Sequence, residues 1–366
     1  MNKLALFLLL LLLIAPSLSA QSPEPTLDEK IGEMLMIGFK GFEVRDTSHI
    51  VRDIRKFHLG GVILFDYDVP TDQPVRNVEN PDQIKKLITQ INNLTDKKLF
   101  IAVDQEGGRV ARLKESRGFV TNVSAEYLGE IDNVDSTRYY AGTMANQLDE
   151  LGFNVNFAPV VDLNINPDNP VIGRIERSFS ADPDAVVKHA SIFLNEFNEH
   201  NILGVLKHYP GHGSAWNDSH VGMADVTETW RESELEPYRE LVQTDNRFAI
   251  MTAHVLNENL DAEWPATLSE EVQTNILRNQ LGFEGVLFSD DMQMEAIRSF
   301  YGLETAITRA INAGVDVLVF GNNSVYWPDI VPQAVEIIKQ KVESGEIPGD
   351  RIDASYKRII KAKESL

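Results

Sequence analysis

Three histidines and a carboxylate follow one apolar run in the middle of the chain. The run opens the segment 205–213 (VLKHYPGHG), and Asp218 and His220 follow after a short insert. The apolar residues predict a buried strand, and the proline and glycines after them predict a loop at its C-terminal end. A lone histidine is most often a hydrogen-bonding group near a turn, but here His208, His212 and His220 are grouped. Because loops at the C-terminal ends of parallel strands carry catalytic residues, we expect chemistry on this loop.

Asp218 and His220 are separated by one residue, so their side chains can converge on a loop. A carboxylate that accepts a hydrogen bond from an imidazole orients the ring and raises its pKa toward neutrality. Such a histidine can give a proton to a leaving group and later take one from water. The pair therefore predicts a general acid/base.

A second candidate for chemistry is Asp290, which follows the apolar stretch 285–288. A carboxylate at a strand end can act as a nucleophile, a general base or a metal ligand. The alternative is that Asp290 or Asp291 caps a helix beginning near Met292, and one aspartate could serve each role. A carboxylate nucleophile that faces a general acid is the arrangement for retaining glycoside hydrolysis, which normally uses two carboxyl groups ~5–5.5 Å apart. Here His220 would replace the second carboxyl.

Charged residues also follow other apolar runs. They are Asp104, Arg112, Arg177 and Lys207. Cations are costly to place at a buried strand end unless they are paired, and these groups would offer donors and acceptors to sugar hydroxyls. The alternative is ion pairing with Asp104, Glu106 or Asp162, and both roles can hold at once.

Eight apolar runs punctuate the chain, and each leads into a loop rich in Gly, Asp or Asn. The runs are 34–39, 61–65, 99–103, 155–161, 203–207, 248–253, 286–289 and 315–320. Stretches with apolar residues at three- and four-residue spacing lie between them and predict helices. These stretches are 82–94, 136–151, 182–200, 232–242, 269–281, 293–313 and 328–344, with Asp28 predicted to cap an earlier helix.

This alternation predicts an α/β fold, and eight strands are the number that closes a (β/α)₈ TIM barrel. An open, doubly wound sheet is the alternative, but no nucleotide-binding glycine motif follows the first run. The proline-containing loop 66–83 predicts an excursion over the barrel mouth. The sequence therefore predicts a single catalytic domain with its active site at the C-terminal ends of the strands.

The N-terminus has the order of a secretory signal peptide: Lys3, an apolar run 4–15, and small residues up to Ala20. We expect residues 1–20 to be removed, 21–30 to form a linker and 31–366 to form the barrel domain. The protein would then be periplasmic or secreted by a bacterium, with no membrane anchor after cleavage. The chain has no cysteine, so its stability would come from its core alone.

The net charge of the chain limits the classes of molecule that it is expected to bind. Its 366 residues include 55 acidic and 34 basic side chains, a net charge of -21. Such acidity argues against nucleic acid and anionic membranes as partners. We expect a carbohydrate substrate, no cofactor and no metal, and a monomer is favoured.

Four motifs in this order resemble the β-N-acetylglucosaminidase (β-hexosaminidase) branch of the family 3 glycoside hydrolases. They are VDQEGGRV at 103–110, NPVIG…RSF at 169–179, KHYPGHG…DSH at 207–220 and FSDDM at 288–292. The resemblance implies a retaining, exo-acting hydrolase on a (β/α)₈ barrel that releases terminal β-linked N-acetylglucosamine from peptidoglycan fragments or chitin-type oligosaccharides through a covalent glycosyl-enzyme intermediate. It implies Asp290 as nucleophile, His220 as general acid/base and Asp218 as its partner. The sugar-binding positions would be Asp104, Arg112, Arg177, Lys207 and His208.

Two departures from the family pattern border the substrate mouth. The spacing between Gly173 and Arg177 is longer than in many relatives, so Arg174 competes with Arg177 for the sugar-binding role. Asp66 and Asp68 stand where many relatives have Arg-Asn. Many relatives with glucosidase or xylosidase activity also have a second domain that contributes a glutamate as acid/base. Here the chain is expected to be of the single-barrel type, with His220 as the acid.

Other functions remain as alternatives. The same barrel could be a β-glucosidase or a glycoside phosphorylase, because a histidine acid/base carries no negative charge that would repel phosphate. A metal-dependent hydrolase would use His208, His212, Asp218 and His220, but their spacing matches no familiar metal motif. A sugar-binding barrel without catalysis would be expected to lack Asp290 or the Asp218/His220 pair, and all three are present.

Overall fold

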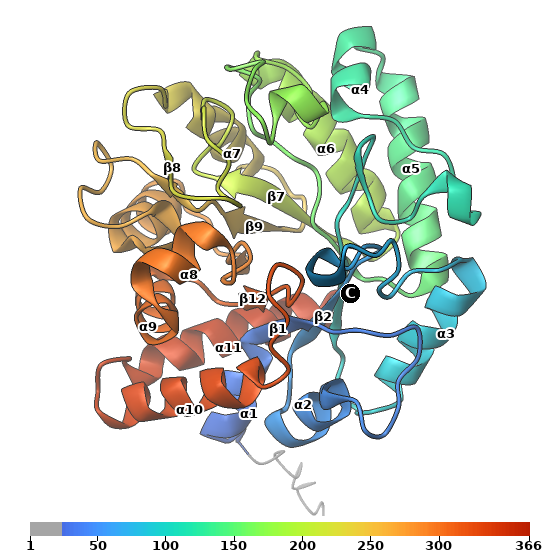
Figure 1. The fold of residues 1–366 in the computed structure, drawn as a ribbon. Helices are drawn as coiled ribbons and strands as arrows, with labels where there is room; N and C mark the ends of the chain where they lie inside the picture. Colours follow the sequence, from blue (N-terminus) through green and yellow to red (C-terminus); the bar gives the residue numbers. More distant parts are fainter. Residues whose placement is uncertain (1–23) are drawn as a thin grey trace, which may run out of the picture.

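Eight parallel strands form a barrel in the computed structural model, which describes residues 24–366 (Figure 1). The predicted signal peptide, residues 1–20, lies outside the described residues. Each of the eight apolar runs coincides with one barrel strand, but β7 continues beyond the predicted end of its run at Lys207 as far as Tyr209. The strands are β1 (Leu35–Gly38), β2 (Gly61–Leu64), β3 (Phe100–Val103), β6 (Val155–Asn156), β7 (Leu203–Tyr209), β9 (Phe248–Thr252), β11 (Leu287–Phe288) and β12 (Leu318–Phe320).

The strands follow one another around the barrel in chain order. β1 pairs with β12, with Met36 opposite Val319. The remaining seam, between β11 and β12, is closed by a parallel bridge from Phe288 to Val317. There the Ser289 N–H donates to the Val317 carbonyl at 2.9 Å. This closure confirms the predicted (β/α)₈ barrel and excludes the open sheet.

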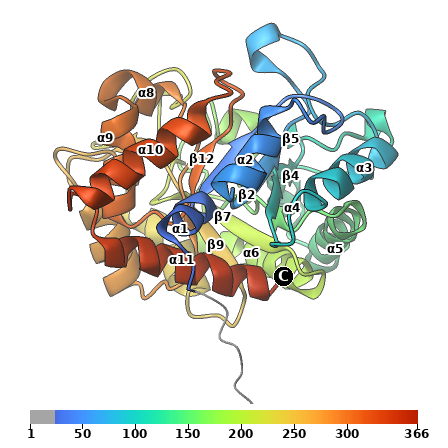
Figure 2. The same ribbon diagram turned by 90° about the horizontal axis from the view of Figure 1, so that it is seen from below.

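Helices surround the barrel (Figures 1 and 2). Their bounds are α1 (Leu27–Glu33), α2 (His49–Phe57), α3 (Pro81–Asn92), α4 (Ala125–Ile131), α5 (Val134–Leu151), α6 (Pro183–Glu199), α7 (Glu236–Leu241), α8 (Glu295–Tyr301), α9 (Leu303–Ala313), α10 (Ile330–Glu343) and α11 (Gly349–Glu364). The segment 271–280 is wound as a π-helix. The helix predicted over 293–313 is interrupted at Gly302, whose φ of +70° does not fit an α-helix.

Short two-stranded pairs decorate the mouth of the barrel. β4 (Gln105–Gly107) pairs with β5 (Val110–Ala111), and β8 (Ala224–Asp225) pairs with β10 (Val255–Leu256). These pairs lie in the loops that follow β3, β7 and β9. They give ordered backbone to loops that carry the predicted site residues.

The first helix starts earlier than the sequence predicted. Thr26 is the N-cap of α1, and its hydroxyl and the Glu29 side chain form a capping box, so the predicted cap Asp28 lies in the first turn instead. The expected linker 21–30 is therefore helical from Leu27 onward. This helix packs against α10 and α11 (Figure 2), and the buried carboxylate of Glu33 pairs there with Lys363, 330 residues further along the chain.

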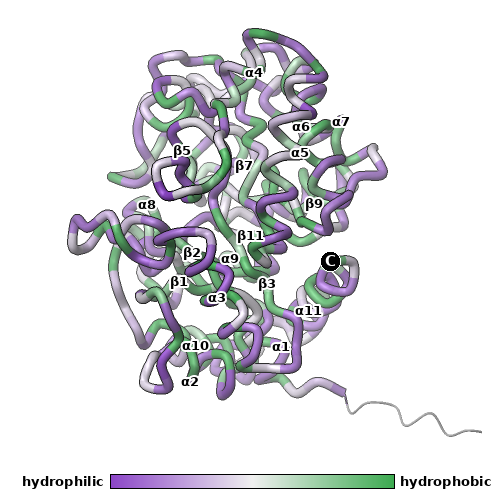
Figure 3. Tube along the Cα trace, turned by 90° about the vertical axis from the view of Figure 1, so that its right-hand side faces the viewer, coloured by the Kyte–Doolittle hydropathy of each residue, from purple (hydrophilic) through white to green (hydrophobic). Residues whose placement is uncertain are grey.

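Buried hydrophobic residues of the strands and of the surrounding helices form one large core cluster. Hydrophobic stretches of the chain run through the interior of the trace in Figure 3. Phe288 lies at the barrel centre, where its ring contacts Phe100 and Phe157 at centroid distances of 5.7 and 5.6 Å. Such tilted and edge-on pairs are the preferred geometries of aromatic rings. Among residues 24–366, no helix has the length and apolar character needed to cross a membrane.

One buried carboxylate organises the opposite end of the barrel from these mouth loops. Asp316, just before β12, is fully buried and accepts from Arg278 at 2.7 Å, Arg351 at 3.0 Å and Arg358 at 3.2 Å. The Leu287 N–H donates to it at 3.0 Å, which ties β11 to β12. The carboxylate therefore joins a strand, the π-helix and α11.

We expect Asp316→Ala to lower the free energy of unfolding by about 3–5 kcal/mol, because it leaves buried guanidinium groups without their counter-charge. Urea unfolding would measure the loss. The matched control is Asp353→Ala, which removes a partly exposed partner of Lys30 and should cost at most about 1 kcal/mol. Equal costs for the two variants would contradict the organising role of Asp316.

Candidate active site

A cavity of about 310 Å³ opens at the C-terminal ends of the barrel strands. It is lined by seven of the eight residues that the sequence analysis proposed for catalysis or sugar binding. The eighth, Asp218, is hydrogen-bonded to His220. The seven are Asp104, Arg112, Arg177, Lys207, His208, His220 and Asp290.

The loop of residues 210–223, between β7 and β8, carries His220; we name it the His220 loop. As predicted, Asp218 and His220 converge: the Nδ1 of His220 lies 2.8 Å from Oδ1 of Asp218, which also accepts the His220 N–H. This hydrogen bond raises the pKa of His220 above its ordinary value of 6.5, in spite of partial burial. With Nδ1 held by the carboxylate, Nε2 is the atom whose proton can be exchanged with a substrate.

Asp290 lies directly after β11 and also lines the cavity. Burial alone would raise its pKa, but electrostatic attraction to the side chains of His254, His208 and His220 outweighs burial and holds the pKa below 3.8. Its Oδ1 accepts the N–H of Asp291 at 2.8 Å. The carboxylate is therefore ionised and oriented, which is the state that a nucleophile needs.

Lys207, Asp104 and Glu106 form an ion-pair cluster in one wall of the cavity. The Lys207 ammonium lies 2.8 Å from Asp104 and 2.6 Å from Glu106, and Arg112 approaches Asp104 at 3.6 Å. The ion pairing expected as an alternative role is thus present. Lys207 is 2% exposed, so these carboxylates compensate for its burial.

Arg177 and Arg174 differ in their surroundings. Arg177 makes two hydrogen bonds to Glu106, at 2.7 and 2.8 Å, and lines the cavity. Arg174 is 63% exposed and pairs with Asp168 at the surface. The geometry therefore assigns the cavity position to Arg177.

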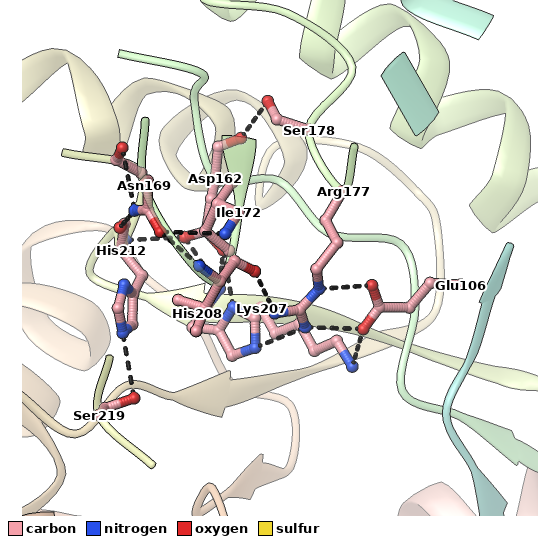
Figure 4. A network of polar contacts seen from close by, with 12 residues as sticks. Glu106, Asp162, Asn169, Ile172, Arg177, Ser178, Lys207, His208, His212 and Ser219 are labelled. Atoms are coloured by element: carbon pink, nitrogen blue, oxygen red, sulfur yellow. Dashed lines mark hydrogen bonds and ion pairs between the residues drawn. The ribbon is translucent and has the colours of Figure 1, made fainter. Parts of the chain in front are cut away.

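A buried carboxylate holds His208 in place (Figure 4). The Nδ1 of His208 lies 2.6 Å from Asp162, and its Nε2 lies 3.2 Å from Nη2 of Arg177. Because arginine can only donate, Nε2 acts as the acceptor and Nδ1 carries the proton that is donated to Asp162. Burial opposes ionisation of Asp162, but its electrostatic attraction to and hydrogen bond with His208, together with the N–H of His212, hold the pKa of Asp162 below 3.8.

Sequence reasoning assigned no site role to several cavity residues. Glu106 appeared only as a possible ion-pair partner, as did Asp162, which lies behind His208 rather than in the cavity lining. Asp291 does not cap α8, whose N-cap is Met294; its Oδ1 accepts the N–H of Gln293 at 3.0 Å and of Gly321 at 2.9 Å. Burial raises the pKa of Asp291 to about 6. Apolar residues also line the cavity, and nothing in the sequence distinguished them from other hydrophobic residues. They form the apolar wall of the cavity, which consists of Ile63, Phe65, Val110, Phe157, Val171, Ile175, Met251, Met294 and Val319.

The segment after β2 reaches the cavity, as predicted for an excursion over the mouth. Val69 contributes to the cavity lining and is 56% exposed. The two aspartates that depart from the family pattern point elsewhere: Asp66 pairs with Lys114 at 2.5 Å, and Asp68 pairs with Lys40 and Arg76. These pairs fix the segment against its neighbours.

The histidines do not assemble as metal ligands. The rings of His208 and His212 lie 6.1 Å apart, and Nε2 of His212 lies 3.1 Å from the Ser219 hydroxyl. Within the described residues, no group of three or more histidine or acidic side chains is arranged to hold a metal ion.

Comparison with known proteins agrees with this arrangement. A model of the glycosyl hydrolase family 3 N-terminal domain matches residues 26–362. Beta-hexosaminidase A of Pseudoalteromonas piscicida is 32% identical over 96% of this chain and 63% of its own length. Beta-hexosaminidase LpqI of Mycobacterium tuberculosis is 31% identical over 92% of this chain and 82% of its own.

Solved structures of similar fold also include members of glycoside hydrolase family 3. A glycoside hydrolase family 3 β-N-acetylglucosaminidase from Paenibacillus sp. FPU-7 superposes with a TM-score of 0.85 at 33% identity, over 93% of this chain and 62% of that one. The structure of LpqI from M. tuberculosis gives a TM-score of 0.78 at 29% identity, over 93% of this chain and 94% of that one. The chain thus spans just under two thirds of the length of the first relative and first structure named here. The family match and these relatives show that the chain belongs to glycosyl hydrolase family 3, and residues 26–362 correspond to the N-terminal domain of that family.

Proposed function

We propose that this protein is a retaining, exo-acting β-N-acetylglucosaminidase that removes terminal β-linked N-acetylglucosamine from peptidoglycan fragments or chitin-type oligosaccharides. The observation that carries the proposal is one cavity lined by both an ionised carboxylate, Asp290, and a histidine whose pKa is raised by its own carboxylate, His220. Relatives named β-hexosaminidase support the choice of sugar.

In the first step, the Asp290 carboxylate attacks the anomeric carbon and forms a covalent glycosyl-enzyme ester. The bond from that carbon to the leaving oxygen breaks, and His220 gives its Nε2 proton to this oxygen. Asp218 stabilises the charged imidazole before the transfer. Because His220 starts positively charged, it would end the step neutral.

In the second step, water attacks the same carbon and releases Asp290. Neutral His220 takes a proton from this water and returns to its charged state. Two displacements at one carbon retain the β configuration.

The groups proposed to bind the sugar are Asp104, Arg112, Arg177, Lys207 and His208. Their ion pairs leave the cavity wall with fixed donors and acceptors, and burial between oppositely charged partners limits their movement. Preorganised groups of this kind lose little entropy when they bind a substrate hydroxyl. The apolar wall opposite would contact the sugar ring carbons and the acetyl methyl.

The proposal makes one direct prediction: the protein hydrolyses aryl β-N-acetylglucosaminide in preference to aryl β-glucoside, equally well with and without phosphate. Initial rates on both substrates would test it, and NMR of the first-formed product should show the β anomer. Preference for the glucoside would reject the assigned sugar. A phosphate requirement would show a phosphorylase, and a first-formed α anomer would reject Asp290 as nucleophile.

We further propose export through a cleaved signal peptide at residues 1–20, on the basis of the apolar run 4–15. The catalytic barrel would then extend from about residue 26, where the family match and α1 both begin. N-terminal sequencing of the protein recovered from its host would test the cleavage site.

A further inference from the structure

The His220 loop has two halves with different surroundings. The inner half, residues 210–215, is bound to the barrel through its backbone. Trp230 donates to the Pro210 carbonyl at 3.1 Å, Asp162 accepts the His212 N–H at 2.8 Å, and Asn169 donates to the His212 carbonyl at 2.7 Å. The outer half, residues 216–223, carries Asp218 and His220. Its side chains are more exposed, with His220 at 56%.

A buried glutamate that has no part in the mechanism above lies against the inner half. Glu234 is only 1% exposed, and its Oε2 accepts the N–H of Gly213 at 3.1 Å. A Cβ added to Gly211 would lie 2.6 Å from the Cβ of Glu234, so the loop rests directly on this side chain. The Ser214 hydroxyl lies beside the same carboxyl without a hydrogen bond of good geometry.

His212 lies between Gly211 and Gly213 and connects Glu234 to the general acid. Its ring points toward Ser219, and its Nε2 lies 3.1 Å from the hydroxyl of Ser219 (Figure 4). Ser219 stands between Asp218 and His220 in the chain. A shift of Gly213 would therefore move His212 and, through Ser219, the Asp218/His220 pair.

The electrostatic surroundings of Glu234 favour its neutral form. Burial, and then the negative charge of Asp162, raise its pKa to about 7, against the hydrogen bonds that it accepts. Tyr238 also faces it, but burial raises the pKa of Tyr238 well above 10, so this phenol stays neutral. Because the pKa of Glu234 is raised in the folded protein, its protonated side chain contributes fully to the stability of the described arrangement below about pH 4.5. This contribution is lost as the pH rises through about 7.

We propose that Glu234 is a positioning residue that keeps the general acid in place by holding Gly213 from beneath the His220 loop. It touches no substrate and acts only through the loop. The proposal rests on the role proposed for His220, and it assigns the support of that residue to the contacts of Glu234 with Gly213 and Gly211.

The test compares three variants. Glu234→Leu has a similar size but cannot accept the Gly213 N–H, whereas Glu234→Gln keeps an acceptor oxygen and cannot ionise. Glu232→Gln is the matched control, because Glu232 precedes Glu234 by two residues with its side chain 79% exposed. Rates would be measured from pH 5 to 9 on glycosides with good and with poor leaving groups.

We expect Glu234→Leu to lower the rate roughly tenfold to a hundredfold with poor leaving groups and much less with good ones, because poor leaving groups need the acid most. Glu234→Gln should match the unmodified protein at pH 5.5 and exceed it several-fold at pH 8.5. If Glu234→Leu lowered the rate equally on both substrates, the effect would be a general structural one and the proposal would be overturned. A Glu234→Gln rate well below that of the unmodified protein at pH 5.5, or no higher than it at pH 8.5, would also overturn the proposal.

Hydrogen exchange supplies a readout that is independent of catalysis. We expect Glu234→Leu to speed amide exchange in residues 210–223 and to leave the barrel strands unchanged, with Glu234→Gln and Glu232→Gln unaffected at pH 6. Unchanged exchange in this loop would reject the positioning role. If the unmodified protein cleaved no aryl N-acetylglucosaminide, the proposed function would fail, while this exchange result would still decide whether Glu234 holds the loop.

Discussion

Asp290→Ala is expected to reduce turnover by about 10⁴- to 10⁶-fold, the loss typical of removing a catalytic nucleophile. Without the carboxylate, no covalent ester can form, and the cavity retains only groups that bind or protonate the substrate. Single-turnover measurements on an aryl β-N-acetylglucosaminide would show the loss. A variant that keeps more than a few per cent of the activity would remove Asp290 from this role.

The fold should survive this change. Among residues 24–366, the Asp290 side chain accepts a hydrogen bond only from the N–H of the next residue and forms no ion pair. Thermal unfolding should therefore be close to that of the unmodified protein. Azide provides a positive control, because it fits in the space left by the carboxylate and attacks the anomeric carbon directly. The expected product is the α-glycosyl azide, of inverted configuration.

His220→Ala should lower the rate by about 10²- to 10⁴-fold when the leaving group is poor. The loss should be much smaller for nitrophenyl leaving groups, which depart without protonation. With these activated substrates, the second step becomes slow because no base deprotonates water. Added azide should then attack the glycosyl-enzyme and give the β-glycosyl azide, the opposite anomer from that expected of Asp290→Ala.

The pH dependence of the Glu234→Gln variant, in which residue 234 cannot ionise, should identify the same two groups. Asp290, with its pKa held below 3.8, must be ionised, so activity should fall only at strongly acidic pH. His220 must be protonated, and its pKa is raised, so activity should fall as the pH rises through a value above 6.5. Asp218→Asn removes the main cause of that raised pKa and should move the basic limb to lower pH. Equal losses of His220→Ala on good and poor leaving groups would contradict its role as the acid.

The barrel itself could be predicted from the sequence because strands and helices have different periods. The eight apolar runs each coincide with a strand, and the polar residues at their C-terminal ends meet at one end of the barrel, as a parallel barrel requires. The helices were less predictable at their ends. Apolar spacing continues through Gly302 without a break, so only the backbone conformation there shows that α8 and α9 are separate.

The sequence suggested possible partners within the site, but it could not predict which of them pair, because this depends on distances between residues far apart in the chain. Glu106 meets Arg177 across 71 positions, and Asp162 meets His208 across 46. Nothing in the local sequence distinguishes Arg177 from Arg174, yet one lines the cavity and the other lies at the surface. The roles of Asp290 and His220 rest on chemistry that the predicted measurements above would decide.

The pairing of Glu33 with Lys363 has a consequence for how the molecule is made. A chain that grows from its N-terminus exposes α1 early, but Lys363, on the helix that covers it, is synthesised 330 residues after Glu33. The end of the barrel opposite the mouth can therefore close only after the chain has been made as far as α11, and until then the apolar face of α1 lacks its native cover. The nascent chain is thus expected to expose this apolar face to chaperones and to other chains for most of the synthesis of the barrel.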